Sequence, residues 1–224
     1  MDKIIGNKKC RIFQRGESGI IFFIGMQSGC EKEFEEICKR VCEMTDKAFV
    51  LFCFECENWN DDFSIWENGA VFGNETFGGN GYKTLEWLEK SALPYVKNEY
   101  KDAPIIISGY SLSGLFSLWA FYESKSFCGA VSCSGSLWFT GWERYIKSHF
   151  AHHKSIIYLS LGNNEEKTKN KIMSTVGDMT RLTYDTILND ENIEKCKLEY
   201  NEGGHFKDAE MRLAKGIVWA VENM

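Results

Sequence analysis

The sequence contains 224 residues, of which 44% are hydrophobic and 14% aromatic, and its formal net charge is −6. This composition excludes a disordered chain, and the length favours one domain that spans residues 1–224. Basic residues are interspersed with acidic ones, and the apolar stretches are far shorter than the roughly 20 residues that cross a bilayer, so neither nucleic acid nor a membrane is expected as a partner.

Short apolar runs alternate with longer segments of helical spacing along the chain. The apolar runs predict strands at 10–15, 19–25, 48–54, 103–109, 127–134, 155–162 and 195–200. The stripes between them predict helices at 31–45, 83–99, 112–124, 166–188 and 208–223. Because the middle strands are apolar on both faces, the alternation predicts an α/β fold in which helices cover both sides of a mostly parallel sheet.

The segment 55–82 fits neither pattern. It is rich in glycine, asparagine and aromatic residues and has neither a helical nor a strand period. A loop of this length in a compact domain is usually functional or mobile. We therefore expect this segment to contribute to a binding site.

The N-terminal residues and the nine cysteines bear on the cellular compartment. No apolar stretch near the start is long enough for a signal peptide, which predicts a cytoplasmic location and reduced cysteines. Cys53 and Cys56 form a C-x-x-C pair, but no second pair is present to complete a zinc ribbon. We interpret them as packed core residues and expect neither a metal nor a cofactor. The alternative, a redox or metal protein, would require bound zinc or a reversible disulfide.

One serine, Ser111, lies where the predicted strand 103–109 turns into the predicted helix 112–124. Ligands of open α/β sheets bind at the carboxyl ends of the strands, so a side chain at this turn points into the ligand crevice. A tight turn requires small residues two positions either side, and Gly109 and Ser113 satisfy that requirement. The resulting motif is G-x-S-x-S-G rather than G-x-S-x-G. The structural alternative is a serine that caps an ordinary helix.

A serine hydroxyl needs a base before it becomes a nucleophile, and the chain has four histidines. Three of them, at positions 149, 152 and 153, lie in a charged stretch that predicts a solvated surface. His205 instead follows the predicted strand 195–200 through the sequence NEGG, at another carboxyl-end loop. We therefore predict His205 as the base.

The imidazole in turn needs a carboxylate to fix its tautomer. Glu165 and Glu166 follow the predicted strand 155–162, and we predict Glu165 as the acid with Glu166 as the alternative. The alternative is a purely structural role, in which the two glutamates are first-turn acids that complement a helix dipole. Three other acids are weaker candidates, because they fall within a helix, after a helix and within a strand: Asp185, Asp190 and Glu199.

Acyl chemistry also needs two donors for an oxyanion and walls for a substrate pocket. We expect one donor to be the N–H of Leu112 and the other to be the N–H of Met26 or Gln27, in the Gly-flanked turn after the strand 19–25. The predicted pocket walls are aromatic residues of the carboxyl-end loops, namely Trp59, Trp66, Trp138 and Trp142, with Phe63, Phe77 and Phe139 beside them. The structural alternative for each tryptophan is a position in the core.

Four segments between residues 108 and 220 together resemble the esterase family of the α/β-hydrolase superfamily that includes esterase D, enterochelin esterases and feruloyl or acetyl-xylan esterases. These segments are SGYSLSGLFSLWA, AVSCSGSLWFTGW, LSLGNNEEKTKN and NEGGHFKDAEMRLAKGIVWA. The resemblance implies an α/β-hydrolase fold and the chain order nucleophile, acid, base. The chain is shorter than many members of the family, and we expect no separate lid domain. It assigns these roles to Ser111, Glu165 and His205. The chain departs from the family at Ser113, where glycine is usual, and some relatives work with a Ser–His pair alone.

Together these features predict a serine esterase that cleaves a small-molecule carboxylic ester through an acyl-enzyme. An acyltransferase with the same triad is one alternative, and a ligand-binding protein of the same fold without turnover is another. Association into a homo-oligomer is compatible with the sequence.

Overall fold

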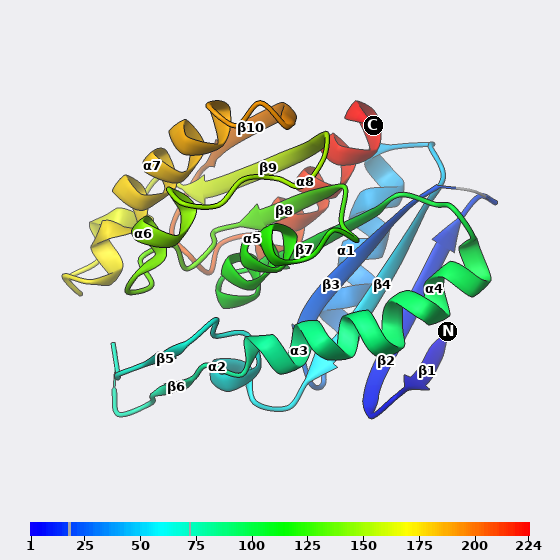
Figure 1. Ribbon diagram of the computed structural model, residues 1–224, viewed down its shortest axis with the longest axis horizontal. Helices are drawn as coiled ribbons and strands as arrows, with labels where there is room; N and C mark the ends of the chain where they lie inside the picture. Colours follow the sequence, from blue (N-terminus) through cyan, green and yellow to red (C-terminus); the bar gives the residue numbers. More distant parts are fainter. Residues whose placement is uncertain (18, 72) are drawn as a thin grey trace.

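A mostly parallel sheet of eight strands runs through the computed structural model, which describes residues 1–17, 19–71 and 73–224 (Figure 1). The strand order is β1-β2-β4-β3-β7-β8-β9-β10. The strands are β1 (Asp2–Ile5), β2 (Lys8–Arg15), β3 (Ile20–Gln27), β4 (Phe49–Cys56), β7 (Ile105–Tyr110), β8 (Gly129–Cys133), β9 (Ser155–Gly162) and β10 (Ile193–Asn201). Within this sheet only the pairs β1–β2 and β2–β4 are antiparallel, so the prediction of a mostly parallel sheet is confirmed.

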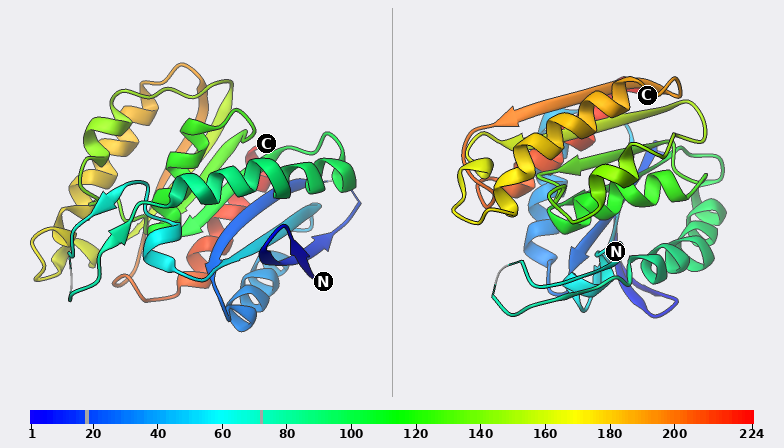
Figure 2. Two further views of the ribbon diagram at one scale, coloured as in Figure 1. Left: turned by 60° about the horizontal axis from the view of Figure 1, so that its bottom comes forward. Right: turned by 60° about the vertical axis from the view of Figure 1, so that its left-hand side comes forward.

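Helices cover both faces of the sheet (Figure 2). One face packs against α1 (Glu31–Met44) and α8 (Ala209–Asn223). The other face packs against α3 (Gly81–Trp87), α4 (Leu93–Tyr100), α5 (Leu112–Glu123), α6 (Trp142–Ile146) and α7 (Val176–Leu188). Each face carries its own apolar core, which explains why the central strands are apolar at successive positions.

Strand β7 shows how the two cores share one strand. Ile105 and Ile107 belong to the core beneath α5, whereas Ile106 belongs to the core beneath α1 and α8. All three side chains are buried. Burying an isoleucine completely contributes roughly 1.5–3 kcal/mol, so this strand is held firmly on both faces. The residue that follows it, at the carboxyl end, is therefore attached to a rigid support.

Two of the predicted helices differ from the observed ones. The segment 83–99 is interrupted by a π-helical turn, η1 (Leu88–Ala92), that separates α3 from α4. The predicted helix 166–188 is wrong in its first half, where two short 3₁₀ turns, η2 (Glu165–Lys167) and η3 (Met173–Thr175), precede α7. The physical reason lies at Asn170, whose side-chain oxygen accepts from the N–H groups of Ile172 and Met173 and so closes a local turn instead of a helix.

Several short elements carry no sequence signal. Strand β1 has four residues and helix α6 has five, which is too little for either period to show. The aperiodic segment 55–82 contains the single turn α2 (Trp59–Asp62) and a hairpin of β5 (Glu67–Asn68) and β6 (Phe77–Gly78). Side-chain hydrogen bonds fix this segment, since Asp61 accepts from the N–H of Gly78 and Ser64 accepts from the N–H of Gly79.

Among the described helices, none combines the length and the apolar character that a bilayer crossing needs.

Candidate active site

Ser111 lies on a strained turn between β7 and α5. Its φ of 60° and ψ of −124° are unfavourable for a residue with a side chain. The turn is held by its own backbone, because the Ser111 N–H donates to the Cys133 carbonyl at 3.0 Å and the Ser111 carbonyl accepts from Gly114, Leu115 and Ser136. These backbone hydrogen bonds hold the Ser111 hydroxyl in place at the carboxyl end of β7.

The small residues around this turn are required by close contacts. A Cβ atom on Gly109 would lie 2.3 Å from the Ser113 carbonyl oxygen. Ser113 itself is fully buried, and its hydroxyl donates to the Gly25 carbonyl on β3 at 2.9 Å. A hydroxymethyl group therefore fits where the motif usually has glycine, because β3 supplies an acceptor for it.

The His205 ring lies between Ser111 and Glu165. Its Nδ1 is 2.7 Å from Glu165 Oε2, and its Nε2 is 2.9 Å from Ser111 Oγ. An ionised carboxylate can only accept, so the hydrogen must lie on Nδ1 and donate to Glu165. In the neutral ring Nε2 is then the acceptor, and the Ser111 hydroxyl donates to it. This tautomer is the one that can remove the serine proton.

Glu165 is buried and keeps both carboxylate oxygens occupied. Oε1 accepts from Ser134 Oγ at 2.7 Å, from the Gly162 N–H at 2.7 Å and from Arg212 Nη1 at 2.8 Å, which leaves Oε2 for His205. Burial acts to raise the pKa of Glu165, but the hydrogen bonds from His205 and Ser134 outweigh it and hold the pKa below its ordinary value. The carboxylate is therefore ionised at neutral pH.

The alternative acid, Glu166, lies elsewhere. Its carboxylate pairs with Arg181 at 2.8 Å on the surface. Consecutive residues of a 3₁₀ turn point in different directions, which is why one of two adjacent glutamates reaches His205 and the other does not.

Arg212 is a member of this site that the sequence analysis missed. Its side chain is 1% exposed, and Nη1 contacts Glu165, while Nη2 donates to the carbonyls of Gly204 at 2.9 Å and Glu202 at 3.2 Å. One guanidinium thus holds both the acid and the loop that carries His205. The available signal was its position on α8, where helical spacing puts a cation on the same face as Gly216 and Ala220.

Tyr110 adds a second hold on the His205 loop. Its hydroxyl donates to the His205 carbonyl oxygen and accepts from Arg212 Nη1 at 3.3 Å. Burial raises the pKa of Tyr110 to about 12, so this hydroxyl keeps its proton and remains a donor.

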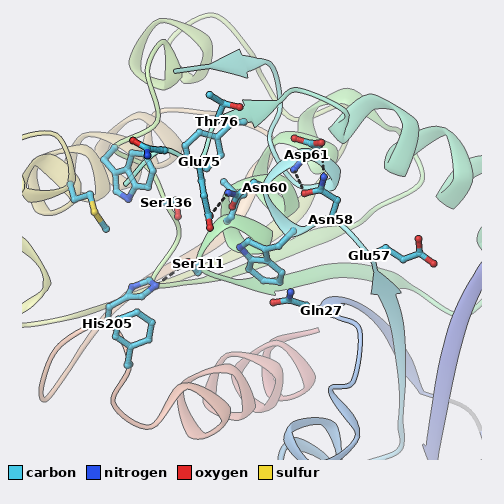
Figure 3. A pocket seen from close by; sticks show the side chains of 17 residues that line it. Gln27, Glu57, Asn58, Asn60, Asp61, Glu75, Thr76, Ser111, Ser136 and His205 are labelled. Carbon is cyan, nitrogen blue, oxygen red and sulfur yellow. Dashed lines mark hydrogen bonds between the residues drawn. The ribbon is translucent and has the colours of Figure 1, made fainter. Parts of the chain in front are cut away.

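A cavity of about 700 Å³ opens over Ser111 and His205 (Figure 3). Leu112 and Gln27, two of the three predicted oxyanion donors, line it. Leu112 is the first residue of α5, so its N–H has no acceptor within the helix. Met26 instead lines an adjoining cavity of about 350 Å³, to which Gln27 and Trp59 also contribute.

The predicted tryptophan walls separate into two groups. Trp59 and Trp138 line the cavity over Ser111. Trp142 does not, because the short helix α6 turns it into the core, where it is fully buried and its Nε1 donates to Thr183 Oγ1 at 2.9 Å. Trp66 also lies away from the lining, with its Nε1 donating to the Thr140 carbonyl at 2.7 Å.

The geometry does not support the alternative of a redox or metal protein built on the C-x-x-C pair. Cys53 and Cys56 belong to the cores on opposite faces of the sheet. All nine cysteines are free. Within the ranges that the structure describes, no three His, Cys, Asp or Glu side chains are grouped in a way that could hold a metal ion.

Comparison with solved structures identifies the architecture. An IroE-like serine hydrolase from Shewanella oneidensis matches with a TM-score of 0.80 at 14% identity, over 96% of this chain and 76% of that one. The siderophore hydrolase EstA from Aspergillus nidulans matches with a TM-score of 0.77 at 13% identity, over 96% of this chain and 90% of that one.

A third structure, an S-formylglutathione hydrolase from Agrobacterium tumefaciens, matches with a TM-score of 0.63 at 10% identity, over 99% of this chain and 93% of that one. No protein-family model and no curated protein sequence matches the chain. The likeness establishes the predicted α/β-hydrolase fold.

Proposed function

We propose that the protein is a serine hydrolase that cleaves a carboxylic ester through an acyl-enzyme intermediate. The observation that carries this proposal is the continuous hydrogen-bonded chain from Ser111 Oγ through His205 to the ionised Glu165. An arrangement that served only to cap α5 would need neither the strained serine backbone nor the buried carboxylate behind the imidazole. The fold it shares with proteins described as serine and siderophore hydrolases supports the same assignment.

In the first half of the reaction, Ser111 Oγ attacks the ester carbonyl carbon while His205 Nε2 takes the hydroxyl proton. The imidazolium that forms is stabilised by Glu165. The N–H of Leu112, with that of Gln27 or Met26, donates to the carbonyl oxygen as it becomes negative. Collapse of the tetrahedral intermediate breaks the ester C–O bond, and His205 returns the proton to the leaving alcohol.

In the second half, water replaces the alcohol. His205 Nε2 takes a proton from this water, which attacks the acyl carbon, and the proton then passes to Ser111 Oγ as the acid leaves. An alcohol or amine acceptor in place of water would give acyl transfer by the same steps. Product ratios measured with added acceptors distinguish the two reactions.

The test combines p-nitrophenyl acetate turnover with labelling by a fluorophosphonate, which reacts with activated serines. Wild type should turn over the ester and become labelled. In Ser111→Ala we expect labelling to disappear and kcat to fall by about 10⁴-fold or more. Ser148→Ala, which removes an exposed serine outside the cavity lining, should behave as wild type. Absence of labelling in wild type, or undiminished turnover in Ser111→Ala, would refute the proposal.

A further inference from the structure

The cavity over Ser111 has an unbalanced charge. Its lining residues include Glu57, Asp61 and Glu75 but no lysine or arginine among the described residues, and Figure 3 shows the Glu57 carboxylate turned away from the Ser111–His205 pair. The rest of the polar lining is neutral amide and hydroxyl, apart from His205. A cavity with several anionic groups and no cation attracts positive charge and repels negative charge, because its low-dielectric walls focus the field.

The carboxylates of Glu75 and Asp61 are held by neutral partners only. Glu75 precedes β6, and Figure 3 shows its carboxylate directed into the cavity toward the Ser111–His205 pair. It accepts from Asn60 Nδ2 at 3.0 Å. Asp61 accepts from the Gly78 N–H at 2.8 Å and from Asn58 Nδ2 at 2.7 Å. Amide donors fix the position of a carboxylate without cancelling its charge, so both charges remain available to a ligand.

A second, independent feature, at Ser136, offers a ligand a hydrogen bond at the floor of this cavity. Ser136 is 3% exposed, and its N–H donates to the Ser111 carbonyl at 3.0 Å. Its hydroxyl lines the cavity and has no hydrogen-bond partner among the described residues (Figure 3). The oxygen is not among the enclosed atoms that lack a partner, so the hydroxyl is open to the cavity, and its partner there is solvent or a polar atom of a bound ligand. The position beside Ser111 puts that partner next to the group under attack.

Aromatic rings complete the walls. Trp59 and Trp138 line the cavity, and both are half-buried, so part of each indole faces the open space. An indole face attracts an ammonium or guanidinium group, and the attraction adds to that of nearby carboxylates. Anions gain nothing from either kind of wall.

We propose that this cavity selects esters that carry a positively charged nitrogen, which lies against Glu75 and Asp61 while Ser136 hydrogen-bonds a polar atom beside the ester. This inference rests on the hydrolase function proposed above. It names the class of substrate that the same site prefers.

The test uses two acetate esters of nearly identical shape. Acetylcholine carries a quaternary nitrogen, and 3,3-dimethylbutyl acetate has carbon in its place. An anionic ester, 4-acetoxybutanoate, serves as the opposite case. At low salt we expect kcat/KM to be about tenfold higher for the cationic than for the neutral ester, and lower still for the anionic one. Raising the ionic strength from about 20 mM to about 0.5 M should shrink the ratio, because salt screens an exposed charge pair.

Two variants assign the effect to the cavity. Glu75→Gln removes the charge but keeps the shape and the contact with Asn60, and it should bring the ratio down to about twofold. Glu67→Gln changes the net charge equally, at an exposed position of the same hairpin outside the cavity lining, and should leave the ratio unchanged.

The outcomes separate the two proposals. Equal kcat/KM for the cationic and neutral esters, or an unchanged ratio in Glu75→Gln, overturns the charge selection and leaves the hydrolase function standing. Ser111-dependent turnover of the neutral ester tests the hydrolase function separately. If no ester is hydrolysed and no fluorophosphonate label appears, the hydrolase function falls and the substrate class falls with it.

Discussion

Replacing Arg212 with methionine removes the group that joins Glu165 to the loop that carries His205. The guanidinium is almost fully buried, lies 2.8 Å from Glu165 Oε1 and donates to two carbonyls of the loop before His205. Methionine has a similar length but no charge and no donors. Leaving one member of a buried ion pair without its partner costs about 3–5 kcal/mol. Because domains of this kind unfold at a cost of about 5–15 kcal/mol, R212M should remain folded but be clearly less stable.

The effect of R212M should depend on pH in a defined direction. In wild type the pKa of Glu165 is lowered, so the folded state gains stability above the pKa of the unfolded chain and loses it as the pH falls through the folded pKa. Without Arg212 the buried carboxylate loses a cation, and its pKa should rise. Protonation of Glu165 then removes the unpaired buried charge in the variant, and it does so at a higher pH than in wild type. The difference between the two proteins should therefore be largest near pH 7 and should shrink as the pH approaches 4.

Urea unfolding followed by tryptophan fluorescence, at pH 7 and again near pH 4.5, measures this difference. R181M is the matched control, since it removes an arginine that pairs with Glu166 and Asp178 on the surface and should cost less than about 1 kcal/mol. R212K keeps the charge but loses the two-pronged contact, and should fall between wild type and R212M. A loss below about 1 kcal/mol for R212M at pH 7, or a loss that is equal at both pH values, would refute the reasoning.

Two further substitutions test the surroundings of the site. Ser134→Ala removes a hydrogen bond that lowers the pKa of Glu165, so that pKa should rise. Stability at pH 7 should fall by about 1.5–3 kcal/mol, and urea unfolding curves of variant and wild type should converge as the pH falls through the lowered pKa of Glu165 in wild type. Curves that stay parallel at all pH values would contradict this. Gly109→Ala places a Cβ 2.3 Å from the Ser113 carbonyl oxygen, so thermal melting should report a loss of several kcal/mol or insoluble protein. Gly69→Ala is the control, because a Cβ there would meet nothing within 4 Å, and it should change stability by less than about 0.5 kcal/mol. Equal melting temperatures for Gly109→Ala and Gly69→Ala would show that the contact of Gly109 with the Ser113 carbonyl does not limit stability.

The sequence reveals most of the sheet and the three residues that lie at its carboxyl end. Strands covered on both faces leave long apolar runs, and the residues that follow such runs gather at one edge of the sheet, so the grouping of Ser111, Glu165 and His205 could be predicted from position and residue type. The choice between Glu165 and Glu166 could be proposed but not decided, because it depends on which way a 3₁₀ turn points each side chain.

Other parts of the site depend on tertiary structure that no local pattern reports. Trp142 and Trp138 are four residues apart and follow the same strand, yet one is core and the other lines the cavity. That difference arises from a helix of five residues, which is too short to leave a period. Arg212 belongs to the site only because α8 brings a guanidinium beneath a loop and an acid that are distant along the chain.

The left-handed backbone of Ser111 has a consequence for how such a chain changes over generations. Glycine adopts that conformation without penalty, so Ser111→Gly would relax the turn. Selection for stability alone would therefore favour glycine at this position, so a serine is expected to persist here only where its hydroxyl serves the proposed reaction.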